Sequence, residues 1–456
     1  MGLKFGTDLI LKTRNLQQVE KMSITDYLKA ITIMEGIKMT ILHTTIMNRF
    51  GKFLSGSKSL MIVALCFGLI FIAVEIAGAQ KIAVKGELIH TSAGDAIENG
   101  TILISDGIIE AVGPESDIQI PSGYELYEAK VVTPGLIDAH SVVGMAGIYN
   151  VPTDQDQLET SSALQPDLRA IDGYNAREEL VGVLRELGIT TVHTGHGPGA
   201  VISGQTMIAK TVGTSVDEAV VEPVTALAMT IGSSIRGQFD SPGTRSKAIA
   251  MLRQELIRAQ EYANGEDDQA RDLQKESLVD LLNGDIYGLI TAHTARDIMT
   301  ALRLQEEFGF KLLLDGASEA YLLMDEIKEA GVPVIIHPTM MRLGGDGENA
   351  SFETAGKLSE AGITVLFQSG YEGYVPKTRV VLYEAAIAIA NGMDYDSALS
   401  SLTIDAAKVL GIDGEVGSLE TGKEADVVLF NGDPFEYTTT TDFVIVNGEV
   451  VSRGGR

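Results

Sequence analysis

The stretch VVTPGLIDAHSVVG, residues 131–144, decides the fold. Two β-branched residues lead into Pro134 and Gly135, and a short apolar run then ends on His140. A strand that ends on an ionisable side chain is typical of barrels, which place their chemistry at the carboxyl ends of parallel strands. A second imidazole on the same face would need to stand at position 142, where the sequence has Val142. The stretch therefore predicts the first strand of a barrel, with one histidine at its end.

Later parts of the chain repeat a helix followed by a strand. Helical stretches end on Gly188, Gly331 and Gly362, and each glycine is followed by a strand rich in β-branched residues. Repeated units of this kind imply a parallel sheet, and the length favours a closed (β/α)8 TIM barrel over residues 134–415. A doubly wound open sheet is the alternative. The stretch 246–285 is helical without an obvious strand, and we expect it to be an insertion over the mouth or side of the barrel.

The segments on either side of the predicted barrel have a different character. Short β-rich pieces separated by turn signals fill residues 80–133, and the segment 416–456 resembles them. We therefore expect both ends to complete one small β-sandwich domain.

The N-terminal part carries a targeting signal. Basic residues precede an uninterrupted apolar run over residues 60–74, and Ala77 and Ala79 form a small-residue cleavage site. Residues 47–79 are therefore predicted to be a signal peptide for export to the bacterial periplasm, with a membrane anchor at 60–74 as the alternative. Residues 1–46 form an uncertain extension, which an upstream start codon chosen in error would explain.

Composition restricts the partners. The net charge of -27 would repel nucleic acid phosphates, so nucleic acid is not an expected partner. After signal cleavage we expect no stable association with a membrane. The only cysteine, Cys66, lies within the predicted signal, so the mature chain would have no thiol chemistry. The remaining expectation is a small-molecule substrate or ligand.

Two motifs carry a resemblance to a known family. The stretch 131–140 and the closing stretch 398–434 (ALSSLTIDAAKVLGIDGEVGSLETGKEADVVLFNGDP) resemble the amidohydrolase superfamily, particularly its imidazolonepropionase-like branch. The resemblance covers about residues 81–451. It implies a divalent metal centre of Zn type at the carboxyl end of the barrel, where bound water attacks amide or lactam C-N bonds or short dipeptide-like amides.

The metal ligands that the resemblance implies are incomplete. His140 and His293 match the first-strand and fifth-strand ligands and are the predicted metal ligands. The second first-strand histidine is replaced by Val142. The sixth-strand histidine should fall at Asp315 or Gly316, and the eighth-strand aspartate, the proton acceptor, should fall at Ser369 or Gly370. Lys210 is a candidate for the fourth-strand bridging ligand, with an exposed lysine as the alternative. The resemblance thus implies a degenerate site that holds at most one ion.

Other histidines argue for remaining chemistry. His140, His193, His293 and His337 each follow a strand-like run, so all four are expected to face one barrel mouth. His193 and His337 are therefore the predicted acid-base residues, and hydrogen-bonded packing is the alternative role for all four. The glycine-rich turn after residue 193 could accept an anion through its N-H groups, or it could simply reverse the chain. The predicted substrate-binding residues are His196, Gly197, Gly199 and Lys210.

Three functional hypotheses follow from these patterns. The first is an exported hydrolase of non-peptide C-N bonds with a reduced metal centre. The second is a catalytically inactive barrel that still binds a small ligand. The third is a structural partner that forms a hetero-oligomer with an intact paralogue, and a homo-oligomer is also open.

Overall fold

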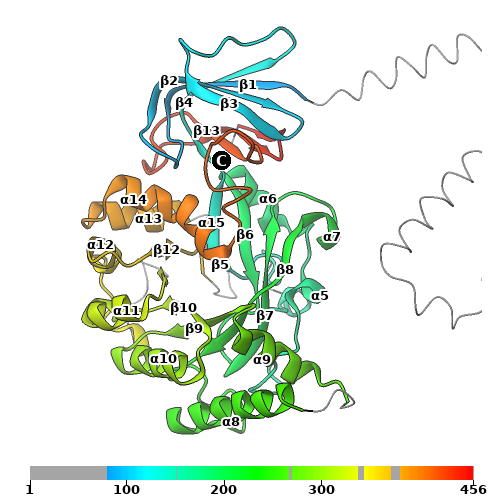
Figure 1. The fold of residues 1–456 in the computed structure, drawn as a ribbon, viewed down its shortest axis with the longest axis vertical. Helices are drawn as coiled ribbons and strands as arrows, with labels where there is room; N and C mark the ends of the chain where they lie inside the picture. The colour runs from blue at the N-terminus through cyan, green and yellow to red at the C-terminus, as the bar shows by residue number, and fades with distance from the viewer. Residues whose placement is uncertain (1–79, 150, 266–269, 337–343, 371–380, 455–456) are drawn as a thin grey trace, which may run out of the picture. The chain divides into compact units, whose positions relative to one another are not determined.

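The computed structural model describes residues 80–149, 151–265, 270–336, 344–370 and 381–454. These residues belong to one compact unit, Ala79–Arg456, in which a barrel is ringed by helices and accompanied by a second sheet (Figure 1). The predicted segments 1–46 and 47–79 lie outside the described residues. The barrel strands, in hydrogen-bonded order, are β5 (Leu136–Ser141), β6 (Ile189–Gly195), β7 (Ile202–Lys210), β8 (Val220–Thr230), β9 (Tyr287–Ala292), β10 (Lys311–Gly316), β11 (Val334–Ile336) and β12 (Val365–Phe367).

The first and last barrel strands meet, so the sheet is nearly closed. A β-bridge joins Ser141, at the end of β5, to Gly370, just after β12. The TIM-barrel-like fold with an additional domain is thus confirmed, and the open doubly wound alternative is wrong because an open sheet would leave these two edges apart.

Helices cover the outside of the barrel (Figure 1). Glycine in the left-handed conformation ends several of them, including Gly331 after α11, as the sequence predicted, and also Gly309 after α10. The helices are α5 (Ala170–Gly173), α6 (Glu179–Glu186), α7 (Val216–Ala219), α8 (Arg245–Ala263), α9 (Leu273–Asn283), α10 (Ala295–Phe308), α11 (Met324–Ala330), α12 (Thr354–Glu360), α13 (Val381–Ala390), α14 (Tyr395–Ser401) and α15 (Ile404–Leu410), with short 3-10 turns η1 (Pro152–Asp154), η2 (Ala320–Leu322) and η3 (Gly345–Gly347).

One barrel strand runs against the expected direction. β7 is antiparallel to both β6 and β8, whereas the other neighbouring pairs are parallel. Only residues 196–201 separate β6 from β7, and a parallel crossover needs a connection of a dozen or more residues. The short glycine-containing turn therefore forms a hairpin, and the expectation of an all-parallel barrel is wrong at this strand.

The helical stretch 246–285 is a crossover and not an insertion. Helices α8 and α9 pack on each other and connect β8 to β9, which pair in parallel. Both helices place apolar side chains in the core outside the barrel, including Leu252 and Leu281. The pair thus takes the place of the single helix that usually joins two parallel strands.

The lower half of the barrel interior is filled by apolar side chains. Every second residue of a strand faces inward, and these positions hold a packed cluster of small and branched residues. They include Ile137, Ala139, Ile208, Ala226, Leu289, Leu313, Ile335 and Leu366. Because this layer blocks the interior, a site must lie above it, at the carboxyl ends of the parallel strands.

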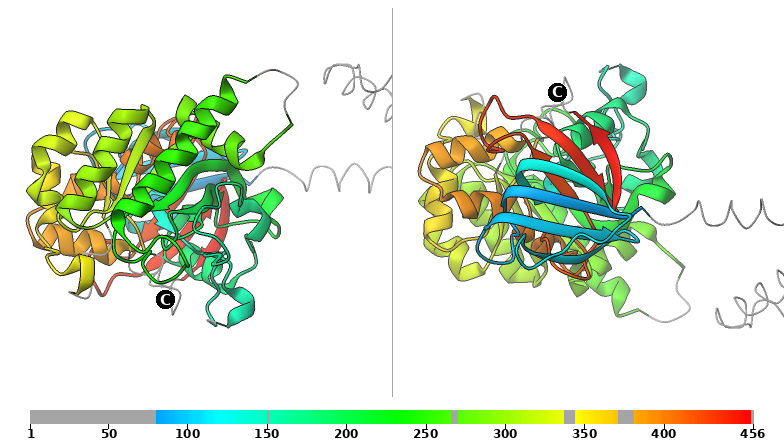
Figure 2. Two further views of the ribbon diagram at one scale, coloured as in Figure 1. Left: turned by 90° about the horizontal axis from the view of Figure 1, so that it is seen from below. Right: turned by 90° about the horizontal axis from the view of Figure 1, so that it is seen from above.

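Both ends of the chain contribute to the second sheet. The N-terminal strands lie directly beside the C-terminal strands (Figure 2, right). In the described residues these strands form one hydrogen-bonded sheet of seven strands. In spatial order they are β15 (Glu449–Arg453), β14 (Thr441–Val446), β13 (Val427–Phe430), β4 (Glu125–Pro134), β1 (Ile82–Ile89), β2 (Ile97–Ser105) and β3 (Ile108–Pro114).

A search of the described residues for a helix long and apolar enough to cross a bilayer finds none. The predicted apolar segment 60–74 lies outside those residues.

Candidate functional site

A layer of buried polar residues lies next to the packed apolar layer of the barrel interior, on the side of the carboxyl ends of the parallel strands. Its members come from four parallel strands: β5 supplies Asp138 and His140, β6 supplies His193, β9 supplies Thr291 and β10 supplies Asp315. Gln368 follows β12, and these side chains are almost completely buried. Alternation along the strands places several of them directly above the inward-facing apolar residues.

The carboxylate of Asp315 is the centre of this layer. His140 Nδ1 lies 3.2 Å from Asp315 Oδ1, and both side chains are fully buried. Thr291 Oγ1 donates to Asp315 Oδ2 at 2.6 Å, and Gln368 Nε2 donates to Oδ1. An ionised carboxylate can only accept hydrogen bonds, which assigns the donor side of the Gln368 amide. Three donors from three strands therefore converge on one acidic group.

His193 is held by hydrogen bonds at both ring nitrogens. Nδ1 lies 2.7 Å from the Ala139 carbonyl and must donate to it, which leaves Nε2 to accept from Thr206 Oγ1 at 2.7 Å. Burial, together with the neighbouring His140, lowers the pKa of His193 to about 3. The predicted acid-base residue thus reaches the polar layer, but it is a neutral imidazole with both nitrogens in use.

Asp138 joins the first and last barrel strands. Its carboxylate accepts from the Ser369 N-H at 3.1 Å and from Ser369 Oγ, next to the β5–β12 bridge. Burial raises the pKa of Asp138 to about 6, and the hydrogen bonds from Ser369 and from the His140 N-H oppose part of this rise. Ser369, one of the two positions (with Gly370) where the resemblance implied a proton-accepting aspartate, therefore donates hydrogen bonds where the first and last barrel strands meet.

His293 lies at the mouth, directly after β9. Its Nδ1 is 2.8 Å from Ser318 Oγ, and its ring packs on Gly316, where an added Cβ would lie 2.5 Å from Cε1. Burial lowers the pKa of His293, and the carboxylates of Asp315, Asp346 and Asp297 oppose the shift. His293 therefore faces acidic groups, and Ser318 holds its ring.

The described residues do not by themselves provide a metal site. Structural and catalytic zinc sites use at least three protein ligands, and no group of three or more His, Cys, Asp or Glu side chains with suitable geometry occurs in the described part of the chain. His140 and Asp315 approach each other, but Asp315 also binds two hydrogen-bond donors. The predicted acid-base residue His337 lies outside the described residues.

The glycine-rich turn does not present free N-H groups at the two predicted positions. The Gly197 N-H donates to the Gln157 carbonyl at 2.9 Å, and the Gly199 N-H donates to Thr230 Oγ1 at 2.9 Å. An anion would have to displace these internal acceptors. His196 lies in the same turn and is buried.

Lys210 lies at the opposite end of the barrel from the histidines. The prediction that it is a bridging ligand or a substrate-binding residue is therefore wrong. It ends β7, the third barrel strand, and because β7 is antiparallel its end points toward the second sheet. Lys210 Nζ lies 2.7 Å from Asp426 and 2.9 Å from Glu424. It is also buried, so the exposed-lysine alternative is wrong as well.

Sequence reasoning missed the hydrogen-bonding partners within this layer. Thr291 precedes His293 by two residues, and Gln368 follows the inward-facing Leu366 by two, so the alternation could have identified both. Thr206 and Ser318 gave no such signal, because their roles depend on the β7 hairpin and on the loop after β10.

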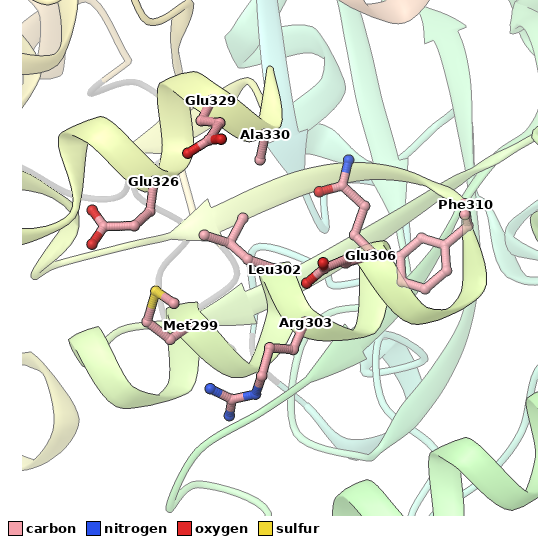
Figure 3. Close-up of a pocket in the computed structure, with 10 residues that line it drawn as sticks. Met299, Leu302, Arg303, Glu306, Phe310, Glu326, Glu329 and Ala330 are labelled. Atoms are coloured by element: carbon pink, nitrogen blue, oxygen red, sulfur yellow. The ribbon is translucent and has the colours of Figure 1, made fainter.

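A hollow of about 480 Å3 lies elsewhere, in the outer layer between α10 and α11 (Figure 3). Met299, Leu302 and Phe310 line it together with charged residues such as Glu326. No residue of the polar layer contributes to its lining.

Comparison with known proteins agrees with this architecture. The family model described as the amidohydrolase family matches residues 375–451. An imidazolonepropionase from Geobacillus sp. (strain WCH70) is 25% identical over 79% of this chain and 92% of its own length. The amidohydrolase tasK from Hapsidospora irregularis is 24% identical over 74% of this chain, which spans only 38% of that longer protein.

Solved structures show the same relationship. The crystal structure of an amidohydrolase from Thermotoga maritima MSB8 matches 82% of this chain and all of its own with a TM-score of 0.77 and 26% identity. A molinate hydrolase matches 82% of this chain and 95% of its own at a TM-score of 0.51 and 15% identity, a likeness of fold alone. The barrel, the two-ended sheet domain and these similarities together support the assignment of the chain to the amidohydrolase superfamily, in its imidazolonepropionase-like branch.

Proposed function

We propose that this protein binds a small amide-type molecule at the barrel mouth without the metal-dependent hydrolysis typical of its superfamily. Similarity to proteins named imidazolonepropionase and amidohydrolase supports a function related to the hydrolysis of C-N bonds. The finer proposal, a degenerate site that has lost hydrolysis, depends on the polar layer.

The observation that carries the proposal is the hydrogen bonding of Asp315. The resemblance puts Asp315 at or next to the place of the sixth-strand ligand, and its oxygens accept from Thr291 and Gln368 and lie beside His140. Hydrogen-bond donors thus stabilise this carboxylate at a place where a metal ion would otherwise do so. A hydrogen-bonded network of this kind can stabilise the barrel interior without an ion.

Two described groups that could have served as the base support the same proposal. Ser369 donates hydrogen bonds to Asp138 where the first and last barrel strands meet. His193 is neutral, and both of its ring nitrogens are hydrogen-bonded. Neither group is available to accept a proton from an attacking water.

One observation favours a second candidate function, a hydrolase with a reduced centre. The distance of 3.2 Å from His140 Nδ1 to Asp315 Oδ1 suits a hydrogen bond, but two ligands of one tetrahedral zinc ion are also about 3.3 Å apart. His140 and His293 remain the candidate ligands under this alternative.

Elemental analysis of the protein expressed with added zinc distinguishes the two functions. We expect far less than one ion per chain for the wild type. The matched control is the variant Val142→His/Asp315→His/Gly370→Asp, which restores the ligand pattern implied by the family and should gain zinc. Stoichiometric zinc in the wild type, lost in His293→Ala, would overturn the proposal and favour the reduced hydrolase.

We also propose export and oligomerisation on the basis of the sequence. The pattern of residues 47–79 supports secretion, and N-terminal sequencing of the protein from the periplasmic fraction should begin at Gln80. Retention of residues 60–74 in a membrane fraction would instead support an anchor. A homo-oligomer or a complex with an intact paralogue is tested by size measurements on the co-expressed pair, in which separate monomers would contradict both.

A further inference from the structure

One described loop passes over part of the barrel mouth. Residues 344–350, here called the mouth strap, follow β11, the seventh barrel strand, and include η3. Side chains of the strap bond to residues that follow β8, the fourth strand, and β10, the sixth strand. Because β9 lies between these two strands in the barrel, the strap extends over the end of β9, where His293 lies.

Asp346 is the first anchor of the mouth strap. Its Oδ2 accepts from the Ser233 N-H at 2.5 Å, and its Oδ1 accepts from Arg245 Nη2 at 2.9 Å. The chain just after β8 leaves room for this carboxylate, because a Cβ at Gly232 would lie 2.9 Å from Asp346 Oδ2. Burial lowers the pKa of His293, and Asp346 is among the carboxylates that oppose this shift. The first anchor therefore lies near the His293 ring.

Arg245 supplies the positive charge that holds Asp346. It stands at the first position of α8, where a cation is unfavourable because the helix dipole is positive there. Its Nε donates to Asp297 Oδ1 at 2.9 Å, while its Nη2 donates to Asp346. The Asp297 side chain is only 2% exposed, whereas that of Asp346 is 19% exposed. When Asp346 moves away, Arg245 still neutralises the buried Asp297, so release of the strap leaves no buried charge unpaired.

Asn349 is the second anchor of the mouth strap. Its Nδ2 donates to Glu319 Oε1 at 2.6 Å, and its carbonyl oxygen accepts from Tyr321 Oη at 3.1 Å. The Glu319 N-H in turn donates to the His293 carbonyl at 2.9 Å. The two anchors therefore hold the strap on both sides of His293, one after β8 and the other after β10.

The strap itself has little packing to hold it in place. Within residues 344–350, all of which the structure describes, only Gly347 is buried. A Cβ added at Gly344 or Gly345 would meet nothing within 4 Å, and glycine gives the backbone more accessible conformations than other residues do. The two polar anchors, and not a hydrophobic core, therefore fix the strap, and exposed segments with few apolar contacts are those that open locally.

We propose that the mouth strap is a lid, which the contact between Arg245 and Asp346 holds closed over His293 and which opens to admit a ligand to the barrel mouth. Opening breaks the polar contacts of the two anchors and leaves the core of the barrel intact. The lid goes beyond the proposed binding function, because it controls access to His293 whether the ligand is only bound or also hydrolysed.

Chemical modification of histidines in the full-length protein measures how often the lid opens. Diethyl pyrocarbonate reacts with accessible neutral imidazoles, and the tryptic peptide 276–296 contains His293 and no other histidine. In Asp346→Ala we expect His293 to react about tenfold faster than in the wild type, because the rate follows the population of the open lid. About 0.5 M NaCl should also speed the reaction in the wild type but not in Asp346→Ala, because salt screens a partly exposed ion pair.

Two controls separate lid opening from a general loss of structure. Glu307→Ala removes the acid of an exposed ion pair between α8 and α10 and should leave the rate at His293 unchanged. The tryptic peptide 186–210 carries two buried histidines and should react at the wild-type rate in Asp346→Ala. An unchanged rate at His293 in Asp346→Ala would overturn the lid. An equal increase for the peptide 186–210 would also overturn it, because the whole barrel would then be opening.

Discussion

At the scale of single residues, His193 gives a pH-dependent prediction. Its pKa is lowered to about 3 in the fold from about 6.5 in an unfolded chain, so the neutral form is favoured by folding. The stability it contributes is fully present above pH 6.5 and is lost as the pH falls toward 3. Between pH 6.5 and 5, the wild type should lose roughly 1.5 kcal/mol of unfolding free energy relative to His193→Gln.

Urea unfolding at several pH values measures this difference. The control is Asp172→Asn, because an exposed carboxylate whose pKa is lowered by Arg169 titrates below this window. Its difference from the wild type should stay flat between pH 5 and 6.5. A flat profile for His193→Gln as well would mean that His193 is not buried as a neutral ring and would reopen its acid-base role.

The sequence predicted which residues reach the mouth better than it predicted what they do there. His140 and His193 lie near the carboxyl ends of β5 and β6, and this position puts them in the polar layer with Asp315. Alternation marks Gln368 as inward-facing, but its pairing with Asp315 could not be predicted, because the two residues are 53 positions apart and meet only when the barrel closes. A histidine count alone also cannot tell a satisfied ring such as His193 from one such as His196, whose ring nitrogens have no partner among the described residues.

At the scale of elements, sequence patterns predicted the strands of the β6–β7 hairpin but not their relative direction. Apolar and β-branched runs identified the strands, and terminal glycines identified the ends of the helices. Strand direction depends on the length of each connection, and the short turn at 196–201 reverses β7. That reversal moves Lys210 to the far end of the barrel and brings Gly204 and Thr206 to the mouth.

Substitution of Gly195 tests how closely the backbones of β6 and β7 approach each other in this hairpin. Its φ is 154°, and an added Cβ would lie 2.7 Å from the Thr206 Cα and 2.8 Å from the Gln205 carbonyl oxygen. These are backbone atoms that cannot move aside without shifting β7. Gly195→Ala should therefore lower the unfolding free energy by about 2–4 kcal/mol. Gly243→Ala, where an added Cβ meets nothing within 4 Å, should change it by less than about 0.5 kcal/mol, and equal effects would contradict the tight hairpin.

At the scale of the whole described unit, a buried ion pair connects the barrel to the second sheet. Lys210 ends β7, while Asp426 and Glu424 precede β13. Burial tends to lower the pKa of Lys210, but the two carboxylates raise it above its usual value. Asp426 also accepts from the Asn447 N-H at 2.9 Å, so one carboxylate joins the barrel to both β13 and the β14–β15 turn.

Removing one partner should cost more than removing both. Lys210→Met leaves Asp426 buried without its counter-ion, so we expect a loss of about 3–5 kcal/mol in the free energy of unfolding. In Lys210→Met/Asp426→Asn the buried charge is absent, and part of that stability should return even though a second residue has been changed. Urea unfolding of the wild type, both single variants and the double variant gives the coupling energy directly. If the losses of unfolding free energy in the two single variants add up in the double variant, the pair does not act as one unit. The barrel and the second sheet would then be held together by apolar contacts, such as those of Val428 and Phe430 in the core they share.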